Sequence, residues 1–196
     1  MKVYLIRHGQ TNGNAESFHQ GWGNSHLTEK GVEQATHARE VITKKEFDRI
    51  ICSDLLRTRQ TCDIIFGENA NVEYDARLRE INNTVFIGQH RADLEAKYGE
   101  EYRENCRLMD YSPYGGESST DFLARAADFM KCLEKDETSK RIAVITHGGT
   151  LRAILCYVLG MPLYTTTLKI DNCSISVVEY KNGHWTLIHF NNKSEI

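Results

Sequence analysis

Three short segments of the chain combine histidine, arginine and glycine. They are Arg7-His8-Gly9, Ser53–Arg57 and His147-Gly148-Gly149. Arginine presents a planar fork of N–H donors that suits phosphate, and glycine lets backbone N–H groups come close to an anion. If the segments meet, Arg7, Arg57, His147 and the backbone of Gly148 form a pocket for a tetrahedral phosphoryl group.

His8 is the predicted nucleophile within this pocket. A neutral imidazole attacks phosphorus well, and a histidine between an arginine and a glycine at a strand end is exposed and orientable. The alcohol that leaves needs a proton, which Glu80, on a loop after a predicted strand, is placed to supply. His8 and Glu80 are therefore the predicted catalytic pair.

The elements around these segments indicate why they should meet. Apolar runs at Val3–Ile6 and Ile142–Ile145 predict buried strands, and Phe47–Cys52 is a further predicted strand. One of the segments follows each strand directly or after a single residue. Ligands in α/β proteins gather at the carboxyl ends of parallel strands. We therefore expect the three segments at one edge of one sheet.

Helical patterns alternate with these strands and predict the fold class. One predicted helix has Thr28 as its N-cap and Val32, Ala35 and Ala38 on one face. Two more are predicted to begin at Ser53-Asp54 and after Ser118. The remaining two are predicted to run from about Arg91 to Arg103 and from Leu151 to Leu159. Further strands are predicted at Val72–Tyr74, Leu168–Ile170, Ser174–Tyr180 and Trp185–Phe190, the last two joined by a hairpin at Lys181-Asn182-Gly183. The sequence thus predicts an α/β protein, a three-layer α/β/α sandwich with a mostly parallel central sheet. One domain over residues 1–196 is expected, with the irregular segment 82–116 as a cap insertion.

Composition narrows the possible partners. The 196 residues contain 24 Lys and Arg against 27 Asp and Glu, a net charge of −3, so no overall positive field favours nucleic acid. The apolar run Ala153–Met161 is far shorter than the roughly 20 residues of a membrane-spanning helix. No signal-peptide pattern is visible, so we expect a cytoplasmic protein without a membrane partner. The six cysteines lack a C-x-x-C pair and are expected to be reduced core residues.

Taken singly, the candidate residues also have ordinary structural explanations. A histidine such as His147 more often bonds a neighbouring carbonyl, Arg57 is typical of a solvated helix face, and Glu80 beside Arg79 is typical of a surface pair. The remaining histidines show no metal-ligand spacing, so neither a metal nor another cofactor is predicted.

A series of ordered motifs outweighs these single-residue explanations. Leu5–Thr11 with Asn14 resembles the signature of the histidine phosphatase superfamily, which includes the cofactor-dependent phosphoglycerate mutases. The blocks that follow in the same order are Gln20–Trp22, Leu27–Ala35, Cys52–Thr61, Leu78–Glu80, Gly115–Ser118 and Thr146–Gly149. The resemblance spans almost the whole chain and implies a phosphoglycerate mutase-like fold.

The resemblance also implies roles for individual residues. His8 becomes the phosphorylated nucleophile, Glu80 the proton donor, and Arg7, Arg57 and His147 the phosphate pocket with Asn14 beside it. Gln20 and Gly21, in the second block, are predicted to contact substrate. Between Glu80 and Gly115, the segment Asn82–His90 is longer than the family pattern and lacks the acidic residue of that pattern. The family's rules for substrate specificity therefore cannot be applied to this chain.

The expected substrate is a small phosphorylated metabolite, with inorganic phosphate as product. Polar and aromatic side chains of the 82–116 segment should shape the substrate side of the pocket, namely Asn82, Asn83, Phe86, Tyr111 and Tyr114. The sequence does not indicate an oligomeric state.

Two other functions stay open. A mutase would move phosphate between hydroxyls, would need a bisphosphoglycerate primer, and would use basic cap residues for a second anion, for which the segment offers His90, Arg91, Lys97, Arg103 and Arg107. A catalytically silent phosphate-binding scaffold would have lost a catalytic group, whereas His8, Glu80, Arg57 and His147 are all present. Hydrolysis is the favoured function.

Overall fold

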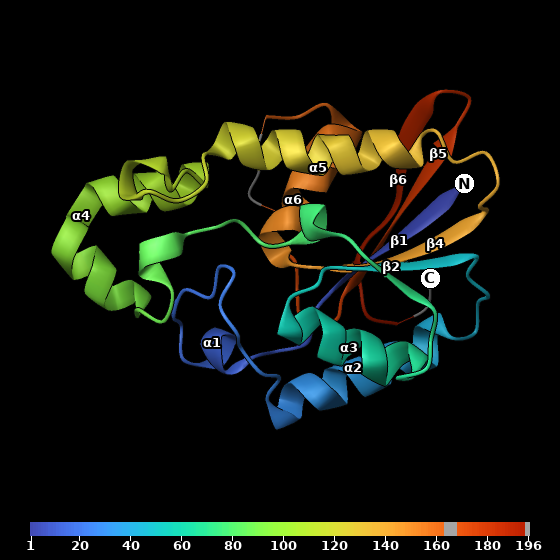
Figure 1. Cartoon of the computed structure of the whole chain (residues 1–196), viewed down its shortest axis with the longest axis horizontal. Coiled ribbons are helices and arrows are strands. Elements are labelled where there is room, and N and C mark those ends of the chain that lie inside the picture. Colours follow the sequence, from blue (N-terminus) through green and yellow to red (C-terminus); the bar gives the residue numbers. More distant parts are fainter. Residues whose placement is uncertain (163–167, 195–196) are drawn as a thin grey trace.

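The computed structural model describes residues 1–162 and 168–194, which build a six-stranded sheet with helices on both faces (Figure 1). The strand order is β3-β2-β4-β1-β5-β6. The bounds are Lys2–Arg7 for β1, Arg49–Cys52 for β2, Val72–Tyr74 for β3, Arg141–Thr146 for β4, Ile175–Lys181 for β5 and His184–Asn192 for β6. Strands β1 to β4 pair in parallel and β5 and β6 in antiparallel fashion, which confirms the predicted mostly parallel sheet.

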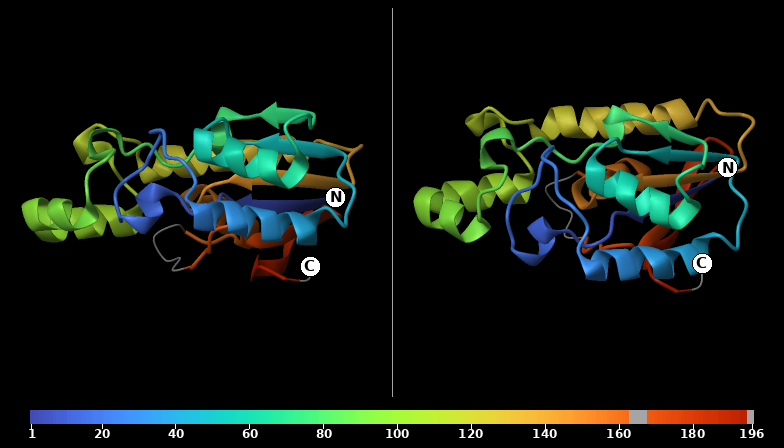
Figure 2. Two further views of the ribbon diagram at one scale, coloured as in Figure 1. Left: turned by 90° about the horizontal axis from the view of Figure 1, so that it is seen from below. Right: turned by 60° about the horizontal axis from the view of Figure 1, so that its bottom comes forward.

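The helices form the two outer layers. Their bounds are Asn12–Ala15 for α1, Glu29–Ile42 for α2, Leu56–Phe66 for α3, Arg91–Leu108 for α4, Ser119–Leu133 for α5 and Gly148–Leu159 for α6. Short 3₁₀ turns are η1 at Ala76–Leu78, η2 at Thr84–Phe86 and η3 at Ser112–Tyr114. Figures 1 and 2 show α2 and α3 on one side of the sheet and α5 on the other.

The apolar residues of β1 explain this three-layer arrangement. Val3 and Leu5 belong to the core cluster shared with α5 and α6, whereas Tyr4 and Ile6 belong to the cluster shared with α2 and α3. Because successive strand residues point to opposite faces, a continuous apolar run requires cover on both. The four residues from Val3 to Ile6 are all buried, as the sequence predicted.

Several predicted boundaries need correction. Thr28 does cap α2 by accepting a hydrogen bond from the backbone of Gly31, but Val32 is 44% exposed because Ala35, Ala38 and Ile42 form the buried stripe one step around the helix. Strand β2 starts at Arg49 rather than at Phe47, and α6 starts at Gly148 rather than at Leu151.

The predicted helix start at Ser53-Asp54 was wrong. The N-cap of α3 is Leu55, which makes no side-chain capping bond. Ser53 and Asp54 instead bind His147 and Arg79, so their polar groups serve the site rather than the helix end. The predicted strand Leu168–Ile170 was also wrong, because the carbonyls of Leu168 and Ile170 accept hydrogen bonds from two arginines instead of forming a ladder.

The segment 82–116 lies beyond one end of the sheet, where α4 projects from the rest of the chain (Figure 2). The helix runs past the predicted end at Arg103 to Leu108, and it kinks at Gly99, whose φ of 60° is strained for residues with a Cβ. A hairpin joins β5 to β6 through Asn182 and Gly183, both with positive φ, as a type I′ turn requires.

The cysteines are free thiols, and four of them are buried as predicted. Cys132 is exposed, which corrects its assignment to the core, and Cys106 is half-buried. Within the described residues no helix is both long and apolar enough to cross a bilayer.

Candidate active site

The three histidine, arginine and glycine segments meet at the carboxyl ends of β1, β2 and β4, beside a pocket of about 240 Å³. This edge collects Arg7 at the end of β1, Arg57 in the first turn of α3 and Gly148 at the start of α6. The described residues that line the pocket are Arg7, His8, Asn14, His19, Gln20, Gly21, Arg57, Glu80, Ile81, Asn83, Arg91, Cys106, Met109, Tyr111, Gly148, Gly149, Arg152 and Ile170. Segments far apart in the sequence thus share one cavity.

The ring of His8 is held in one tautomer. Its Nδ1 lies 2.7 Å from the Gly9 carbonyl, which can only accept, so Nδ1 carries the proton. The neutral ring therefore presents the lone pair of Nε2. His8 is 2% exposed, so the prediction of an exposed ring was wrong. This burial lowers the pKa of His8 well below its usual value, and the charges of Arg57 and Arg7 lower it further. A neutral, nucleophilic imidazole is the form that this environment favours.

His147 is fully buried next to His8 and is not among the described residues that line the pocket. Arg57 Nε donates to its Nδ1 over 3.1 Å, so Nε2 carries the proton of the neutral ring and donates to Ser53 Oγ over 2.8 Å. Burial and then the charge of Arg57 lower the pKa of His147 well below its usual value. The two histidine rings pack with centroids 5.2 Å apart. A direct phosphate contact of His147 stays a prediction.

The two predicted phosphate-binding arginines are held by backbone carbonyls. Arg57 donates from Nη1 to Gly23 over 3.1 Å and from Nη2 to Gly21 over 2.8 Å, and each terminal nitrogen keeps a second N–H. Arg7 donates from Nη1 to Ile170 over 2.6 Å, and its buried Nε has no partner among the described residues. Burial lowers the pKa of Arg57 to about 10, so the guanidinium stays charged at neutral pH.

Asn14 presents a donor to the same cavity. Its Oδ1 accepts from the Thr11 backbone and from Asn172 Nδ2, both over 3.2 Å, which leaves the Asn14 amide N–H groups for a ligand. Asn172 also donates to the carbonyl of His8 over 3.0 Å. Gln20 and Gly21 also line the pocket.

The carboxylate of Glu80 is fixed by two backbone N–H groups. Its Oε1 accepts from Ile81 and its Oε2 from Gly149, each over 3.0 Å. Gly149 has no room for a side chain, because an ideal Cβ there would lie 2.2 Å from Glu80 Oε1. Glycine at this position therefore lets the first turn of α6 approach the carboxylate.

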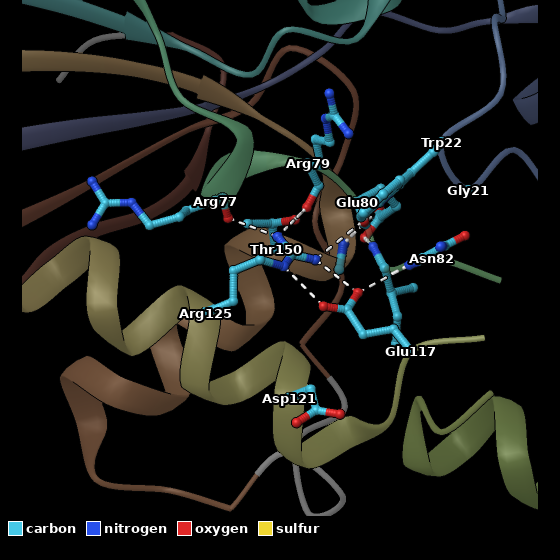
Figure 3. A network of polar contacts seen from close by, with 12 residues as sticks. Gly21, Trp22, Arg77, Arg79, Glu80, Asn82, Glu117, Asp121, Arg125 and Thr150 are labelled. Carbon is cyan, nitrogen blue, oxygen red and sulfur yellow. Dashed lines mark hydrogen bonds and ion pairs between the residues drawn. The ribbon is translucent and has the colours of Figure 1, made fainter. Parts of the chain in front are cut away.

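A network of polar contacts holds the loop that carries Glu80 (Figure 3). Arg125 of α5 forms two hydrogen bonds with the carboxylate of Glu117, each 2.8 Å long, and donates to the carbonyls of Arg77 and Arg79 over 2.7 Å and of Glu80 over 3.3 Å. Across the loop, Trp22 Nε1 donates to the Glu80 carbonyl over 2.7 Å. The backbone around Glu80 is thus tied to two distant segments.

The cap side of the pocket is built around His19. Asn83 Nδ2 donates to His19 Nδ1 over 2.7 Å, and His19 Nε2 lies 2.6 Å from the Tyr102 hydroxyl. Burial, together with the charge of Arg91, lowers the pKa of His19 to about 3. His19 therefore stays neutral and joins the N-terminal loop to α4.

Not every predicted substrate contact reaches the cavity. Asn83 and Tyr111 line it, whereas Asn82, Phe86 and Tyr114 do not. The Asn82 backbone pairs with Glu117, and the rings of Phe86 and Tyr114 pack 4.7 Å apart inside the cap. Among the five basic cap residues named for a mutase, Arg91 is the one found in the described lining.

Several residues at the site were missed by the reasoning from sequence. His19 stands in a loop without a motif, and Arg152 falls on an apolar helix where only the spacing from Gly148 marks it. A position four residues after Gly148 shares its helix face, so this spacing offered a sign that Arg152 would face the pocket. Asn172, which donates to the His8 carbonyl and to Asn14, follows a segment for which the sequence predicted a strand.

Comparisons with known proteins agree with this geometry. The family model of the histidine phosphatase superfamily (branch 1) matches residues 3–193. The chain is 38% identical over 192 residues to the "Probable phosphoglycerate mutase GpmB" of Proteus mirabilis, covering 94% of this chain and 87% of that protein. The protein of the same name from Salmonella paratyphi A is 34% identical over 190 residues, with the same coverage.

Solved structures with the same fold include two phosphatases. The alpha-ribazole phosphatase of Shigella flexneri superposes with a TM-score of 0.90 at 25% identity, covering 100% of this chain and 98% of that one. A mycobacterial glucosyl-3-phosphoglycerate phosphatase gives a TM-score of 0.86 at 29% identity, covering 97% and 98%. This chain therefore belongs to branch 1 of the histidine phosphatase superfamily.

Proposed function

We propose that the protein is a phosphomonoesterase that hydrolyses a small phosphorylated metabolite through a phosphohistidine on His8. The observation that carries the proposal is one cavity in which the neutral Nε2 side of His8, the guanidinium groups of Arg7 and Arg57 and the carboxyl group of Glu80 meet. The histidine phosphatase superfamily is enzymatic, and phosphatases are among the proteins with this fold.

The proposed reaction has two steps. In the first, the Nε2 lone pair of His8 attacks phosphorus, the ester P–O bond breaks, and protonated Glu80 gives its proton to the leaving oxygen. The hydrogen bond from Nδ1 to the Gly9 carbonyl stabilises the charge that the ring gains. In the second, Glu80 takes a proton from water, the water oxygen attacks phosphorus, and the P–N bond breaks to release phosphate and neutral His8.

Arg7 and Arg57 hold the phosphoryl oxygens throughout, and Asn14 and the amino end of α6 add N–H donors. Because their positions are set by backbone carbonyls before substrate arrives, catalysis consists mainly of positioning and charge stabilisation. Every proton and bond in this scheme is handled by the chain itself, so we propose that neither a metal nor another cofactor is needed.

The test is phosphate release from a panel of small phosphomonoesters in the presence of EDTA. His8→Ala should lower kcat/KM by roughly 10³-fold or more, because the nucleophile is lost. His184→Ala, which removes an exposed histidine, should match the wild type. A wild type that releases no phosphate, or a His8→Ala variant that keeps its rate, would overturn the proposal.

A mutase is the second candidate, favoured by the names of the relatives and by Arg91 in the pocket. It requires 3-phosphoglycerate to isomerise in the presence of 2,3-bisphosphoglycerate faster than phosphate is released. Release that outpaces isomerisation favours the phosphatase. If neither reaction occurs, a catalytically silent phosphate-binding scaffold becomes the better explanation.

A further inference from the structure

The carbonyl groups that hold Arg57 belong to one tight turn. A hydrogen bond of 2.7 Å from the Gly23 N–H to the Gln20 carbonyl closes this turn over residues 20–23. Gly21 and Gly23 both accept from the Arg57 guanidinium group through their carbonyls. In the proposed reaction Arg57 holds the phosphoryl group that is transferred, so the turn has a fixed position relative to that group.

Trp22, the residue between the two glycines, contacts the loop that carries Glu80. Its Nε1 donates to the Glu80 carbonyl over 2.7 Å (Figure 3). The same carbonyl accepts from Arg125 over 3.3 Å, which is longer than most hydrogen bonds of this kind, so the indole makes the shorter contact. The guanidinium carbon of Arg79 lies 4.8 Å from the centre of the Trp22 ring, and this contact keeps the ring against the loop.

The bond to the Glu80 carbonyl acts on the Glu80 carboxylate through one peptide unit. A peptide unit is planar, and the carbonyl of Glu80 and the N–H of Ile81 belong to the same one. That N–H donates to Glu80 Oε1 over 3.0 Å. By fixing the direction of the carbonyl, Trp22 therefore also fixes the direction of the N–H that holds the carboxylate. Hydrogen bonds linked in this way also strengthen one another.

The first step of the proposed reaction depends on the distance between the proton donor and the bound phosphoryl group. The leaving oxygen is bonded to the phosphorus atom, and the carboxyl group of Glu80 must come within hydrogen-bond reach of it. A displacement of about 1 Å in such a group costs roughly 100-fold. The turn at residues 20–23 binds Arg57 through its carbonyls and the Glu80 carbonyl through Trp22, so it relates the two groups to each other.

We propose that Trp22 is a positioning residue that places Glu80 for proton transfer to the leaving oxygen. This inference rests on the proposed function and extends it to a residue outside the described lining of the pocket. Trp22 acts through the peptide between Glu80 and Ile81, and its turn keeps that peptide aligned with Arg57. The role predicts a loss of rate that depends on how much the leaving group needs a proton.

Two esters with different leaving groups test the proposal. The alkoxide of glycerol 3-phosphate needs a proton in order to leave, whereas 4-nitrophenolate leaves without one. Trp22→Phe keeps a ring for Arg79 and removes the N–H donor, and one hydrogen bond corresponds to roughly 3- to 10-fold. We expect kcat/KM for glycerol 3-phosphate to fall by that factor. For 4-nitrophenyl phosphate the change should be less than about 1.5-fold, because kcat/KM ends with departure of the alcohol and this alcohol needs no general acid.

A second variant guards against a failure to fold. Trp22 is 37% exposed, so both Trp22→Phe and Trp22→Ala should fold. Trp22→Ala also removes the ring that contacts Arg79, and its loss with glycerol 3-phosphate should be at least as large as that of Trp22→Phe. Trp185→Phe is the matched control, because it removes the other tryptophan, whose Nε1 donates to Glu134. It should match the wild type with both esters.

A double variant distinguishes positioning from a structural role. In a Glu80→Ala background, Trp22→Phe should change kcat/KM for glycerol 3-phosphate by less than about 1.5-fold, because no carboxyl group remains to be placed. A loss that persists without Glu80, or equal losses with the two esters, would show that Trp22 supports Arg57 or the fold. Either result, or an unchanged rate with both esters, would contradict the proposal.

The backbone amide resonance of Ile81 makes the test independent of turnover. In isotope-labelled protein this resonance should shift in the same direction in Trp22→Phe and in Glu80→Ala, because both changes weaken the bond from the Ile81 N–H to the carboxylate. Trp185→Phe should leave it in place, and an Ile81 resonance that does not respond to Trp22→Phe would overturn the proposal. If the wild type hydrolyses neither ester while the resonance responds, the phosphatase function fails and the placement of Glu80 by Trp22 stands.

Discussion

The two sides of the pocket hold their side chains by different means. On the floor, formed by Arg7, His8, Arg57 and Glu80, each group is fixed by backbone carbonyls or N–H groups. On the cap wall, formed by His19, Asn83, Arg91, Cys106 and Tyr111, the side chain of His19 contacts other side chains, namely those of Asn83, Tyr102 and Tyr111. The positions of the floor groups are therefore set by backbone atoms, whereas the position of His19 in the wall is set by neighbouring side chains.

The largest effect is expected from a substitution that introduces a side chain next to Glu80 in the floor. Gly149→Ala places a Cβ 2.2 Å from Glu80 Oε1 and 2.6 Å from Met109 Cε, so the carboxylate must move. A displacement of about 1 Å in a catalytic group costs roughly 100-fold, and we expect kcat to fall by that factor with little change in KM.

The control for Gly149→Ala is the same substitution in a Glu80→Ala background, where no carboxylate remains to be displaced. There it should lower the residual rate by less than about threefold, since residues that act together are not additive. An equal loss in both backgrounds would show that Gly149 serves the fold rather than the position of Glu80.

The contribution of the cap wall to stability should decrease at low pH. His19 has a pKa of about 3 when folded, because of burial and the charge of Arg91, against about 6.5 when unfolded. Its contribution to stability is complete above pH 6.5 and is lost as the pH falls toward 3, by about 1.4 kcal/mol per pH unit. The free energy of unfolding, measured with urea at several pH values, should fall less steeply with decreasing pH in His19→Gln, by that amount. The His184→Gln variant should keep the wild-type dependence on pH.

The link between floor and cap can be weakened at Glu117. Glu117→Gln removes the charge that pairs with Arg125, a pair whose side chains are 13% and 16% exposed. Because Arg125 also binds the carbonyls around Glu80, we expect kcat to fall by roughly 5- to 10-fold while KM for glycerol 3-phosphate stays unchanged. Asp121→Asn, which alters a helix-capping carboxylate nearby, is the matched control. A change in KM alone would argue against a positioning role.

The smallest effect is expected at Asn83, which lines the wall of the pocket and donates to His19 Nδ1. Asn83→Ala should change the ranking of kcat/KM among phosphomonoesters by roughly threefold, because it removes one neutral hydrogen bond at the pocket surface. Tyr114→Phe should leave the ranking unchanged, since Tyr114 lies outside the described lining. Equal effects of the two would remove the distinction between lining and supporting cap residues.

Much of the fold was predictable because the two central strands, β1 and β4, are apolar on both faces. The run Val3–Ile6 needs cover from two helix layers, and that requirement is visible in the sequence alone. Boundaries failed where polar side chains had tertiary partners. Ser53 and Asp54 have good capping chemistry, yet His147 and Arg79 bind them, and no local pattern reveals a partner that lies far along the chain.

The candidate site divides in the same way. His8, Arg7, Arg57, Gly148 and Glu80 stand at strand ends or in ordered motifs, and all five line the pocket. His147 was placed correctly at this edge, but the bonding of its two ring nitrogens depends on Arg57 and Ser53. Asn82 and Tyr114 were named for their place in the sequence, and the packing of the cap turned them away from the cavity.

The sequence by itself determined the α/β architecture and the family, because apolar periodicity and ordered motifs are local properties of the chain. Only the tertiary structure decided which arginines line the pocket, which tautomers His8 and His147 adopt and which cap residues reach the cavity. Those outcomes depend on hydrogen bonds between distant segments, such as Arg57 with Gly21 and Glu80 with Gly149. Such contacts exist only once folding has brought the segments together.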